Sequence, residues 1–167
     1  MISIAVVSDT HMQRPDNILK TAFDEYMIKS DILIHCGDMV SDEVFLCFEK
    51  HPQFYGVRGN CDYYSLGLDM PVSRTFNLEG MKIGVVHGWG RRSMVGESAA
   101  GSFGPGYDLV LYGHTHERDW SRASTGVGGA LLLNPGSFTA PRDSFKPGFA
   151  ILTLEKGSGP EVDWISI

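Results

Sequence analysis

The sequence of 167 residues has few cysteines and no long apolar run. Its three cysteines, Cys36, Cys47 and Cys61, form no CxxC pair and leave an odd number, which is typical of reduced thiols rather than a disulfide framework. No apolar stretch reaches the roughly 18 residues of a membrane span, and no basic region precedes the short apolar stretch at the start. These absences predict a cytoplasmic protein without a membrane segment.

An excess of positive charge is also missing. Lys and Arg number 14 against 20 Asp and Glu, so the net charge is −6, the wrong sign for bulk nucleic-acid binding. The chain has no internal repeat, low-complexity tract or Pro/Ser-rich linker; only residues 101–106 and 126–129 look like glycine-containing loops. Because a chain of this length with 43% hydrophobic residues can bury its own core, we expect a single domain over residues 1–167.

The first half of the chain alternates strands with helices. Apolar runs at residues 2–7, 31–36 and 54–57 indicate buried strands. Helical periodicity follows Pro15, which we place in the first turn, and continues to about Ser30; a second helix is expected at residues 42–50. This β-α-β-α-β order predicts a parallel sheet whose strand-end loops open on one edge.

The second half is richer in strands. We expect them at residues 75–78, 81–87, 109–112, 130–133, 149–154 and 162–167, with one short helix near residues 93–100. Glu79 and Gly80 are typical of a hairpin turn between the first two of these strands. The whole pattern predicts an α/β fold of two packed sheets with helices outside.

Polar side chains that can bind a metal ion follow the predicted strands. In an α/β sheet, loops at the carboxyl ends of strands converge on one site. Mixed carboxylate, imidazole and amide donors suit Mn, Fe, Ni or Zn, and the absence of cysteine ligands argues against a closed structural zinc site. The seven candidate metal ligands are Asp9, His11, Asp38, Asn60, His87, His114 and His116.

Each candidate also has an ordinary interpretation. A lone aspartate after a strand, such as Asp9 or Asp38, is more often a turn or capping residue. His114 and His116 are two residues apart, so on a regular strand they would face opposite sides. They converge only if the backbone leaves the strand, which Gly113 would permit.

Other polar and sulfur-containing residues fit structural roles. His35 lies inside an apolar run, which favours a hydrogen-bonded core histidine, or one that orients a ligand from behind, over a direct ligand. His51 precedes Pro52 and is expected on the solvated surface. Cys36 and Cys47 are expected to be small buried hydrophobes.

Taken in chain order, the polar blocks resemble those of the calcineurin-like metallophosphoesterases. The resemblance continues near the C-terminus in the manner of the small bacterial and archaeal phosphodiesterase branch. It implies a four-layer α/β/β/α sandwich of two mixed sheets with a two-metal site at the sheet edge. The matching segments are Ser8-Asp9-Thr10-His11, Gly37-Asp38, Gly59-Asn60-Cys61-Asp62, His87-Gly88, Gly113-His114-Thr115-His116 and Asn134-Pro135-Gly136-Ser137 through Pro141-Arg142.

The resemblance also implies how the ligands divide. Asp9, His11 and His116 would hold one metal ion. Asn60, His87 and His114 would hold the other, and Asp38 would bridge the two. Two divalent ions, Mn being the first expectation, would let a bridging hydroxide attack a phosphodiester in line. Asp38, Asn60 and His87 would therefore serve catalysis as well as metal binding.

One residue departs from the pattern of many members of the superfamily. Where protein serine/threonine phosphatases have a histidine that protonates the leaving group, this chain has Cys61. A thiol with an ordinary pKa of about 8.5 can donate a proton but does not replace an imidazolium. Asp62 would be a substitute only if its pKa were raised. This departure argues against a phosphoprotein phosphatase in particular.

Two further residues are candidates for substrate contact. Arg142 offers paired donors for phosphate oxygens, and its ordinary alternative is a surface ion pair with Asp143 or another acid. Trp89 could stack on a base or an aromatic leaving group, and its alternative is packing.

The expected function is therefore hydrolysis of a small-molecule or nucleotide phosphodiester. The alternatives are a phosphomonoesterase or protein phosphatase, and a non-catalytic scaffold, because the retromer subunit Vps29 resembles this fold. Apolar side chains on edge strands would also support a homodimer.

Overall fold

The computed structural model describes residues 1–124 and 129–167, so the predicted loop at residues 126–129 lies, apart from its last residue, outside the described part. Ten strands form two five-stranded sheets. Sheet A has the order β10-β9-β1-β2-β3 and comprises β1 (Ile2–Val7), β2 (Ile32–His35), β3 (Phe54–Gly56), β9 (Gly148–Leu154) and β10 (Glu161–Ser166). Sheet B has the order β4-β5-β6-β8-β7 and comprises β4 (Ser73–Leu78), β5 (Met81–Val86), β6 (Leu109–Leu111), β7 (Arg118–Arg122) and β8 (Leu131–Pro135).

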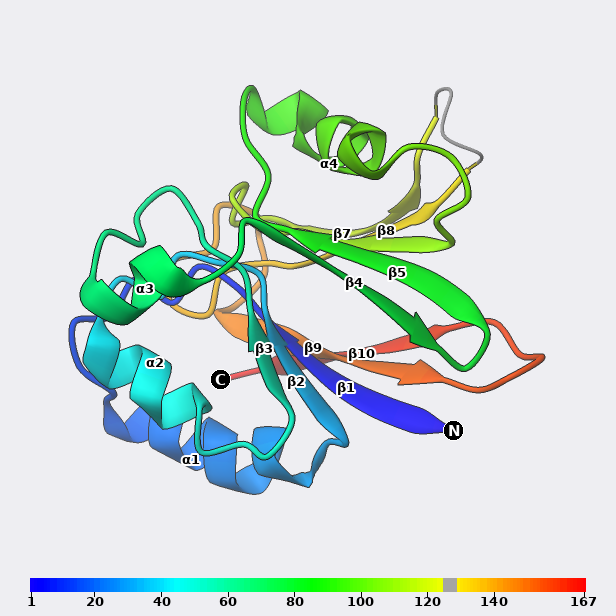
Figure 1. The fold of residues 1–167 in the computed structure, drawn as a ribbon. Coiled ribbons are helices and arrows are strands. Elements are labelled where there is room, and N and C mark those ends of the chain that lie inside the picture. Colours follow the sequence, from blue (N-terminus) through cyan, green and yellow to red (C-terminus); the bar gives the residue numbers. More distant parts are fainter. Residues whose placement is uncertain (125–128) are drawn as a thin grey trace.

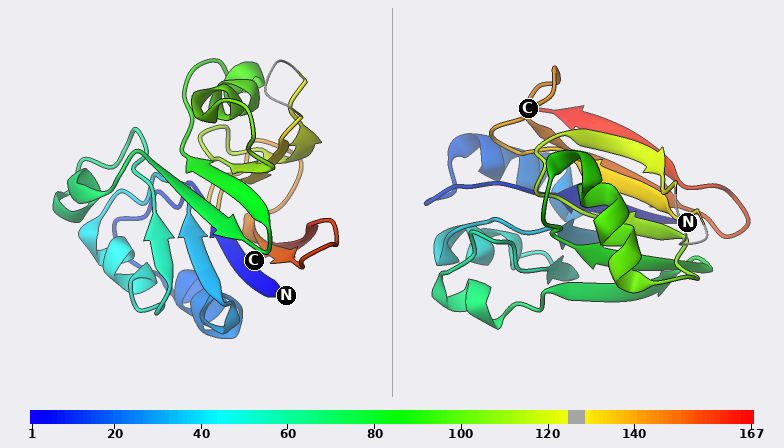
Figure 2. Two further views of the ribbon diagram at one scale, coloured as in Figure 1. Left: turned by 45° about the vertical axis from the view of Figure 1, so that its right-hand side comes forward. Right: turned by 90° about the horizontal axis from the view of Figure 1, so that it is seen from above.

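The two sheets pack face to face with helices on their outer faces (Figures 1 and 2). Helices α1 (Asn17–Glu25) and α2 (Asp42–Phe48) cover sheet A, and α4 (Val95–Phe103) covers sheet B. A further short helix, α3 (Ser65–Asp69), connects β3 to β4 in the chain. The predicted α/β/β/α sandwich is confirmed. No helix among the residues that the structure describes is long and apolar enough to cross a membrane.

The apolar run of β1 is continuous because both faces of sheet A are buried. Ala5 and Val7 pack with the helices α1 and α2, whereas Ile4 and Val6 point between the two sheets. All four side chains have no exposed surface. Two-sided burial is typical of parallel strands, and β1, β2 and β3 are indeed parallel neighbours.

Sheet B is sandwiched in the same way between sheet A and α4. Leu109 and Leu111 of β6 face the inter-sheet core, and Val110 between them faces α4. Glu79 and Gly80 form the predicted hairpin turn between β4 and β5, with φ values of 51° and 84°. Both residues of such a turn need positive φ, as the type I′ geometry requires.

The structure corrects several predicted boundaries. Strand β7 and helix α3 were not expected: β7 is an edge strand with the polar sequence RDWSR, and α3 is a single short turn that contains a glycine. Helix α4 continues to Phe103, into the predicted loop at residues 101–106, after a 3-10 turn at Arg92–Met94. Pro15 stands before the N-cap Asp16 rather than in the first turn of α1, and a separate 3-10 turn, Met27–Lys29, follows that helix.

Candidate metal centre

The seven predicted ligands converge at one end of the sandwich. Four follow β1, β2 and β3 of sheet A, and three lie at the ends of β5 and β6 of sheet B. The strand-end argument is therefore confirmed for all seven. The groups whose ligand atoms lie within 4.8 Å of one another are Asp9, His11 and His116; Asp9, Asp38 and His87; and His11, Asp38 and Cys61.

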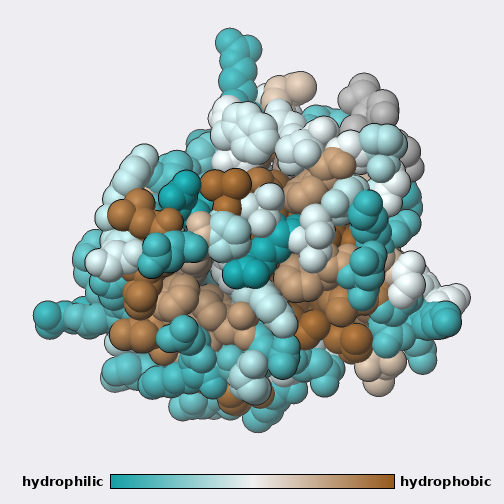
Figure 3. All heavy atoms as spheres, in the orientation of Figure 1, coloured by the Kyte–Doolittle hydropathy of each residue, from teal (hydrophilic) through white to brown (hydrophobic). Residues whose placement is uncertain are grey.

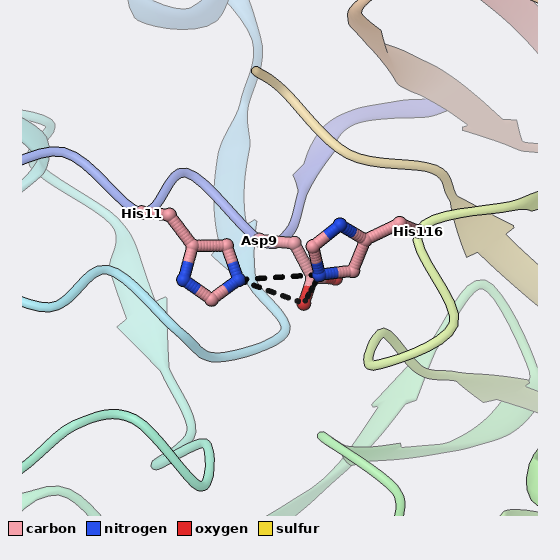
Figure 4. A group of neighbouring side chains, drawn as sticks. All are labelled: Asp9, His11 and His116. Atoms are coloured by element: carbon pink, nitrogen blue, oxygen red, sulfur yellow. Dashed lines mark hydrogen bonds and ion pairs between the residues drawn. The ribbon is translucent and has the colours of Figure 1, made fainter. Parts of the chain in front are cut away.

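Asp9 has a buried oxygen without a hydrogen bond. Its Oδ2 accepts hydrogen bonds from Ser8 Oγ at 2.6 Å and from the backbone N–H of His114 at 3.0 Å. Its Oδ1 accepts none, although the residue is fully buried. Figure 4 shows the rings of His11 and His116 turned toward this carboxylate, with their Nε2 atoms 3.7 and 3.2 Å from Oδ1. A buried carboxylate oxygen without a hydrogen bond is costly, and a cation between these three groups would satisfy it.

A second group of donors surrounds Asn60. Its Oδ1 lies 3.0 Å from His87 Nε2 and 2.9 Å from His114 Nδ1. Asp38 lies between the two groups, because its Oδ2 is 3.3 Å from His87 Nε2 and 3.6 Å from His11 Nε2. This placement fits the bridging position that the family resemblance implied for Asp38.

Two imidazoles have their outer nitrogens fixed by backbone carbonyls. His87 Nδ1 donates to Cys36 O at 2.7 Å, and His116 Nδ1 donates to Ala140 O at 2.9 Å. These bonds leave both Nε2 atoms directed at the carboxylates. Metal-binding histidines are commonly oriented in this way, so the donor set fits divalent ions.

The charges of the cluster favour a cation. Burial opposes ionisation of Asp9, but His11 and His116 outweigh it and hold the pKa of this carboxyl far below its usual range. Burial likewise opposes charge on Asp38, yet His87 lowers its pKa. The pKa of His87, which burial would lower, is raised to about 8 mainly by Asp38. Without a metal, protons on imidazoles thus neutralise the carboxylates, and a divalent ion would replace them.

The pKa values of two further histidines of the cluster, His116 and His114, shift in opposite directions. The pKa of His116 is raised by the contact of this residue with Asp9, against the effect of burial. Burial and the neighbouring His87 lower the pKa of His114, which favours its neutral, metal-binding form.

Five of the seven candidates have a left-handed backbone. Residues other than glycine rarely adopt positive φ, because this conformation costs roughly 1–2 kcal/mol per residue. Such strain clusters at functional sites. The loops are held in place by backbone bonds at 3.0 Å from Asp9 N to Gly37 O and from His11 N to Asp38 O. The five φ values are 52° for Asp9, 44° for His11, 62° for Asp38, 69° for His114 and 62° for His116.

This backbone explains how His114 and His116 converge. The strand ends at Leu111, and both histidines turn by their own positive φ, whereas Gly113 does not have one. Gly113 is needed for a different reason: a Cβ there would overlap Ser8 Oγ and lie 2.9 Å from Asp9 Oδ2. The predicted departure from the strand is confirmed, but its predicted cause, the freedom of Gly113, is wrong.

Asp62 holds two loops together rather than facing a substrate. Its buried carboxylate accepts backbone N–H groups from Asp38 at 2.8 Å, Val40 at 3.0 Å and Gly59 at 2.7 Å. A carboxylate with three backbone donors acts as an acceptor. The geometry therefore favours a positioning role over the proton donor that the sequence suggested.

Cys61 lies in the opening of the cluster and its residue is exposed. Its backbone N–H donates to Asp38 Oδ1 at 2.7 Å, and its thiol receives the amide of Asn60 at 3.2 Å. Partial burial and the nearby Asp38 raise the pKa of the thiol to about 11. No cysteine was among the predicted ligands, yet the sulfur of Cys61 lies within 4.8 Å of ligand atoms of His11 and Asp38. The Gly-Asn-Cys-Asp block was the signal for it.

The two candidate substrate residues lie on different sides of the cluster. Arg142 lines a cavity of about 300 Å³ over the ligands, and its side chain is exposed. The ion pair with Asp143 does not form; Asp143 instead accepts the backbone N–H groups of Arg118 and Phe145. Trp89 is 53% exposed, so the structure does not support packing as its role.

The two histidines outside the cluster are both buried. His35 has the predicted core position: its Nδ1 accepts Gly37 N–H, and its Nε2 lies 2.8 Å from Thr10 Oγ1. Burial lowers its pKa to about 3. The surface placement of His51 is wrong, because it is 2% exposed and donates to Ser30 O at 3.0 Å while accepting Gln53 N–H. Cys36 and Cys47 are buried as expected.

Together, the two-sheet sandwich and the strand-end ligands define a metallophosphoesterase. The model of the calcineurin-like phosphoesterase superfamily domain matches residues 2–157, and the chain belongs to this superfamily. A probable metallophosphoesterase from Methanocaldococcus jannaschii is 34% identical over 147 residues, which are 86% of this chain and 71% of that one. A second protein of this archaeon, named a phosphodiesterase, is 29% identical over 175 residues, covering 96% and 98% of the two chains.

A solved structure of Vps29 from Entamoeba histolytica, complexed with zinc, has the same fold. It superposes with a TM-score of 0.68 and covers 97% of each chain. Its sequence identity is 19%, so this likeness shows the fold alone.

Proposed function

We propose that this protein is a metal-dependent phosphodiesterase that acts in the cytoplasm. The observation that carries the proposal is the buried Oδ1 of Asp9, which accepts no hydrogen bond and faces two imidazole Nε2 atoms. Asp9, His11 and His116 would hold one divalent ion, Asn60, His87 and His114 would hold a second, and Asp38 would contribute to both. We expect manganese to serve in both positions.

The bound ions would supply charge that polarises a phosphoryl oxygen and lowers the pKa of water. The chain's own residues set up the rest of the reaction. Asp9 and Asp38 place two negative charges beneath the substrate, so two divalent ions leave a net positive site for an anionic ester. Arg142, which no acidic side chain of the described residues pairs with, stands at the rim and offers its guanidinium to the remaining phosphate oxygens.

The position that follows Asn60 in the sequence has no histidine to protonate the leaving group. Cys61 occupies that position, and a thiol, with an ordinary pKa of about 8.5, is a weaker acid than an imidazolium. The carboxylate of Asp62 accepts hydrogen bonds from the loop backbone and does not face the substrate. Esters whose leaving groups need little protonation therefore suit the site better than alkyl esters. The relative that is named a phosphodiesterase supports a diester as the substrate.

Metal removal and return tests the proposal. Protein stripped with a chelator is assayed with and without Mn²⁺ on bis(p-nitrophenyl) phosphate and on p-nitrophenyl phosphate. We expect no turnover without metal and a clear preference for the diester with it. Preference for the monoester would identify a phosphomonoesterase instead. Protein that binds no Mn²⁺ and hydrolyses neither ester would be a scaffold, and the proposal would fail.

A further inference from the structure

A second cavity opens directly beside the metal centre. Its volume is about 460 Å³, and Asn60 and His87 form the wall that it shares with the ligand cluster. Binding sites for small molecules have volumes of roughly 300–1,000 Å³. We call this cavity the side pocket. Its other principal lining residues are Arg58, Val72, Thr75, Val86, Trp89 and Phe103.

The side pocket presents apolar and aromatic side chains to solvent. Trp89 is 53% and Val72 58% exposed. Figure 3 shows apolar surface on this face between α3 and α4, next to strongly hydrophilic side chains. Phe103 reaches the pocket only because β5 has a glycine beneath it: a Cβ at Gly84 would stand 2.7 Å from its ring. Exposed aromatic surface in a concave site marks a place where a ligand can cover it.

The pocket also contains a cation without an acidic partner. Arg58 donates from Nη1 to Leu68 O at 3.2 Å, and it forms no ion pair with any acidic side chain of the described residues. Its remaining donors and the hydroxyl of Thr75 supply hydrogen bonds beside the aromatic rings. Aromatic faces with hydrogen-bonding groups at their edge are the combination that recognises unstacked nucleobases.

We propose that the side pocket holds the nucleoside arm of a phosphodiester whose phosphate lies over the metal centre. This inference rests on the proposed function and narrows its substrate class to diesters with one nucleoside group. Trp89 and Phe103 contact the base, and Arg58 and Thr75 contact its polar edge. The wall formed by Asn60 and His87 places the ester bond next to the ligands.

Two substrates with the same leaving group test the pocket. Thymidine 5′-(p-nitrophenyl) phosphate and methyl p-nitrophenyl phosphate both release p-nitrophenolate, so only the other arm differs. We expect the Mn²⁺-loaded protein to favour the thymidine ester by about tenfold or more in kcat/KM, given what stacking of one base contributes. Trp89→Ala should reduce that ratio to about one. Trp120→Ala is the matched control, because Trp120 is 39% exposed on β7 and does not line the pocket.

A binding measurement separates this inference from the proposed function. Thymidine monophosphate, added to metal-free protein, should quench tryptophan fluorescence in the wild type and in Trp120→Phe but not in Trp89→Phe. Absence of quenching in the wild type, or an equal loss of kcat/KM for both esters in Trp89→Ala, would show that the side pocket does not bind a nucleoside. Failure of the wild type to hydrolyse either ester would contradict the proposed diesterase function. The fluorescence measurement would still show whether the side pocket binds a nucleoside. Arg58→Gln, which leaves the rings in place, should lower the substrate ratio severalfold and serves if Trp89→Ala does not fold.

Discussion

The two sheets supply different chemistry to the metal centre. Sheet A contributes both carboxylates, Asp9 and Asp38, which are 0% and 2% exposed. Sheet B contributes only imidazoles, of which His87 and His116 are hydrogen-bonded to backbone carbonyls on their far side. Both carboxylates that attract the ions therefore come from sheet A, whereas three of the four imidazoles come from sheet B. We expect that loss of a carboxylate from sheet A prevents ion binding, whereas loss of an imidazole from sheet B only weakens it.

The loops of the two sheets are also stabilised differently. In sheet A, the carboxylate of Asp62 connects the loops after β2 and β3 through three backbone N–H groups. In sheet B, the loop after β6 is held by Asn134, which donates to Gly113 O at 2.9 Å and to Thr115 Oγ1 at 3.0 Å. Side-chain clamps on both sheets thus sustain the strained backbone of the ligands.

Removal of the shared carboxylate should have the largest effect. Asp38→Asn retains the shape and can still accept the Cys61 N–H bond, but it removes one of the two carboxylates among the predicted ligands. We expect Mn²⁺-dependent diesterase activity to fall by about 10³-fold or more, with an unchanged circular dichroism spectrum. Asp163→Asn on β10 is the matched control and should keep full activity. A folded, fully active Asp38→Asn protein would contradict the two-metal arrangement.

Loss of an imidazole of sheet B should cost less. His116→Gln removes one neutral nitrogen and leaves both carboxylates in place, so we expect activity at saturating Mn²⁺ to fall by about 10²-fold and the Mn²⁺ affinity to weaken. His51→Gln is the control for a buried histidine outside the cluster: it should lower the melting temperature without a change in Mn²⁺ affinity. Equal losses in His116→Gln and Asp38→Asn would show that the sheets do not differ as proposed.

The sequence predicted the location of the candidate ligands better than it predicted the contacts that support them. Asp9, Asp38 and His87 could be identified because each ends an apolar run, and the carboxyl ends of strands share an edge. The positive φ of the histidines and the overlap that excludes a side chain at Gly113 depend on the approach of β1 to the loop after β6. Such contacts between distant segments have no local signature. The same holds for β7, whose polar sequence gives no alternating pattern, and for the burial of His51.

The smallest expected effect is a pH dependence of metal binding that His87 and His116 of sheet B introduce. The pKa values of Asp9 and Asp38 are lowered, so both remain ionised at neutral pH. His87 has a pKa of about 8 in the metal-free protein and must lose its proton to bind a metal. Each proton released makes the Mn²⁺ affinity rise by about tenfold per pH unit. Calorimetric titrations should therefore show tighter binding from pH 6.5 to 8 and a plateau above.

The stability of the metal-free protein should change in the opposite direction over the same range. The folded-state pKa of His87 is raised from 6.5 to about 8, so the stability that its charged form contributes is complete below pH 6.5 and is lost as the pH rises through 8. The raised pKa of His116 acts with the same sign. The lowered pKa of His35, about 3, affects stability only below pH 6.5. Thermal unfolding should thus give a melting temperature that falls from pH 6.5 to 8.5 without metal and rises with Mn²⁺. Parallel curves would mean that the imidazoles of sheet B do not exchange protons for metal.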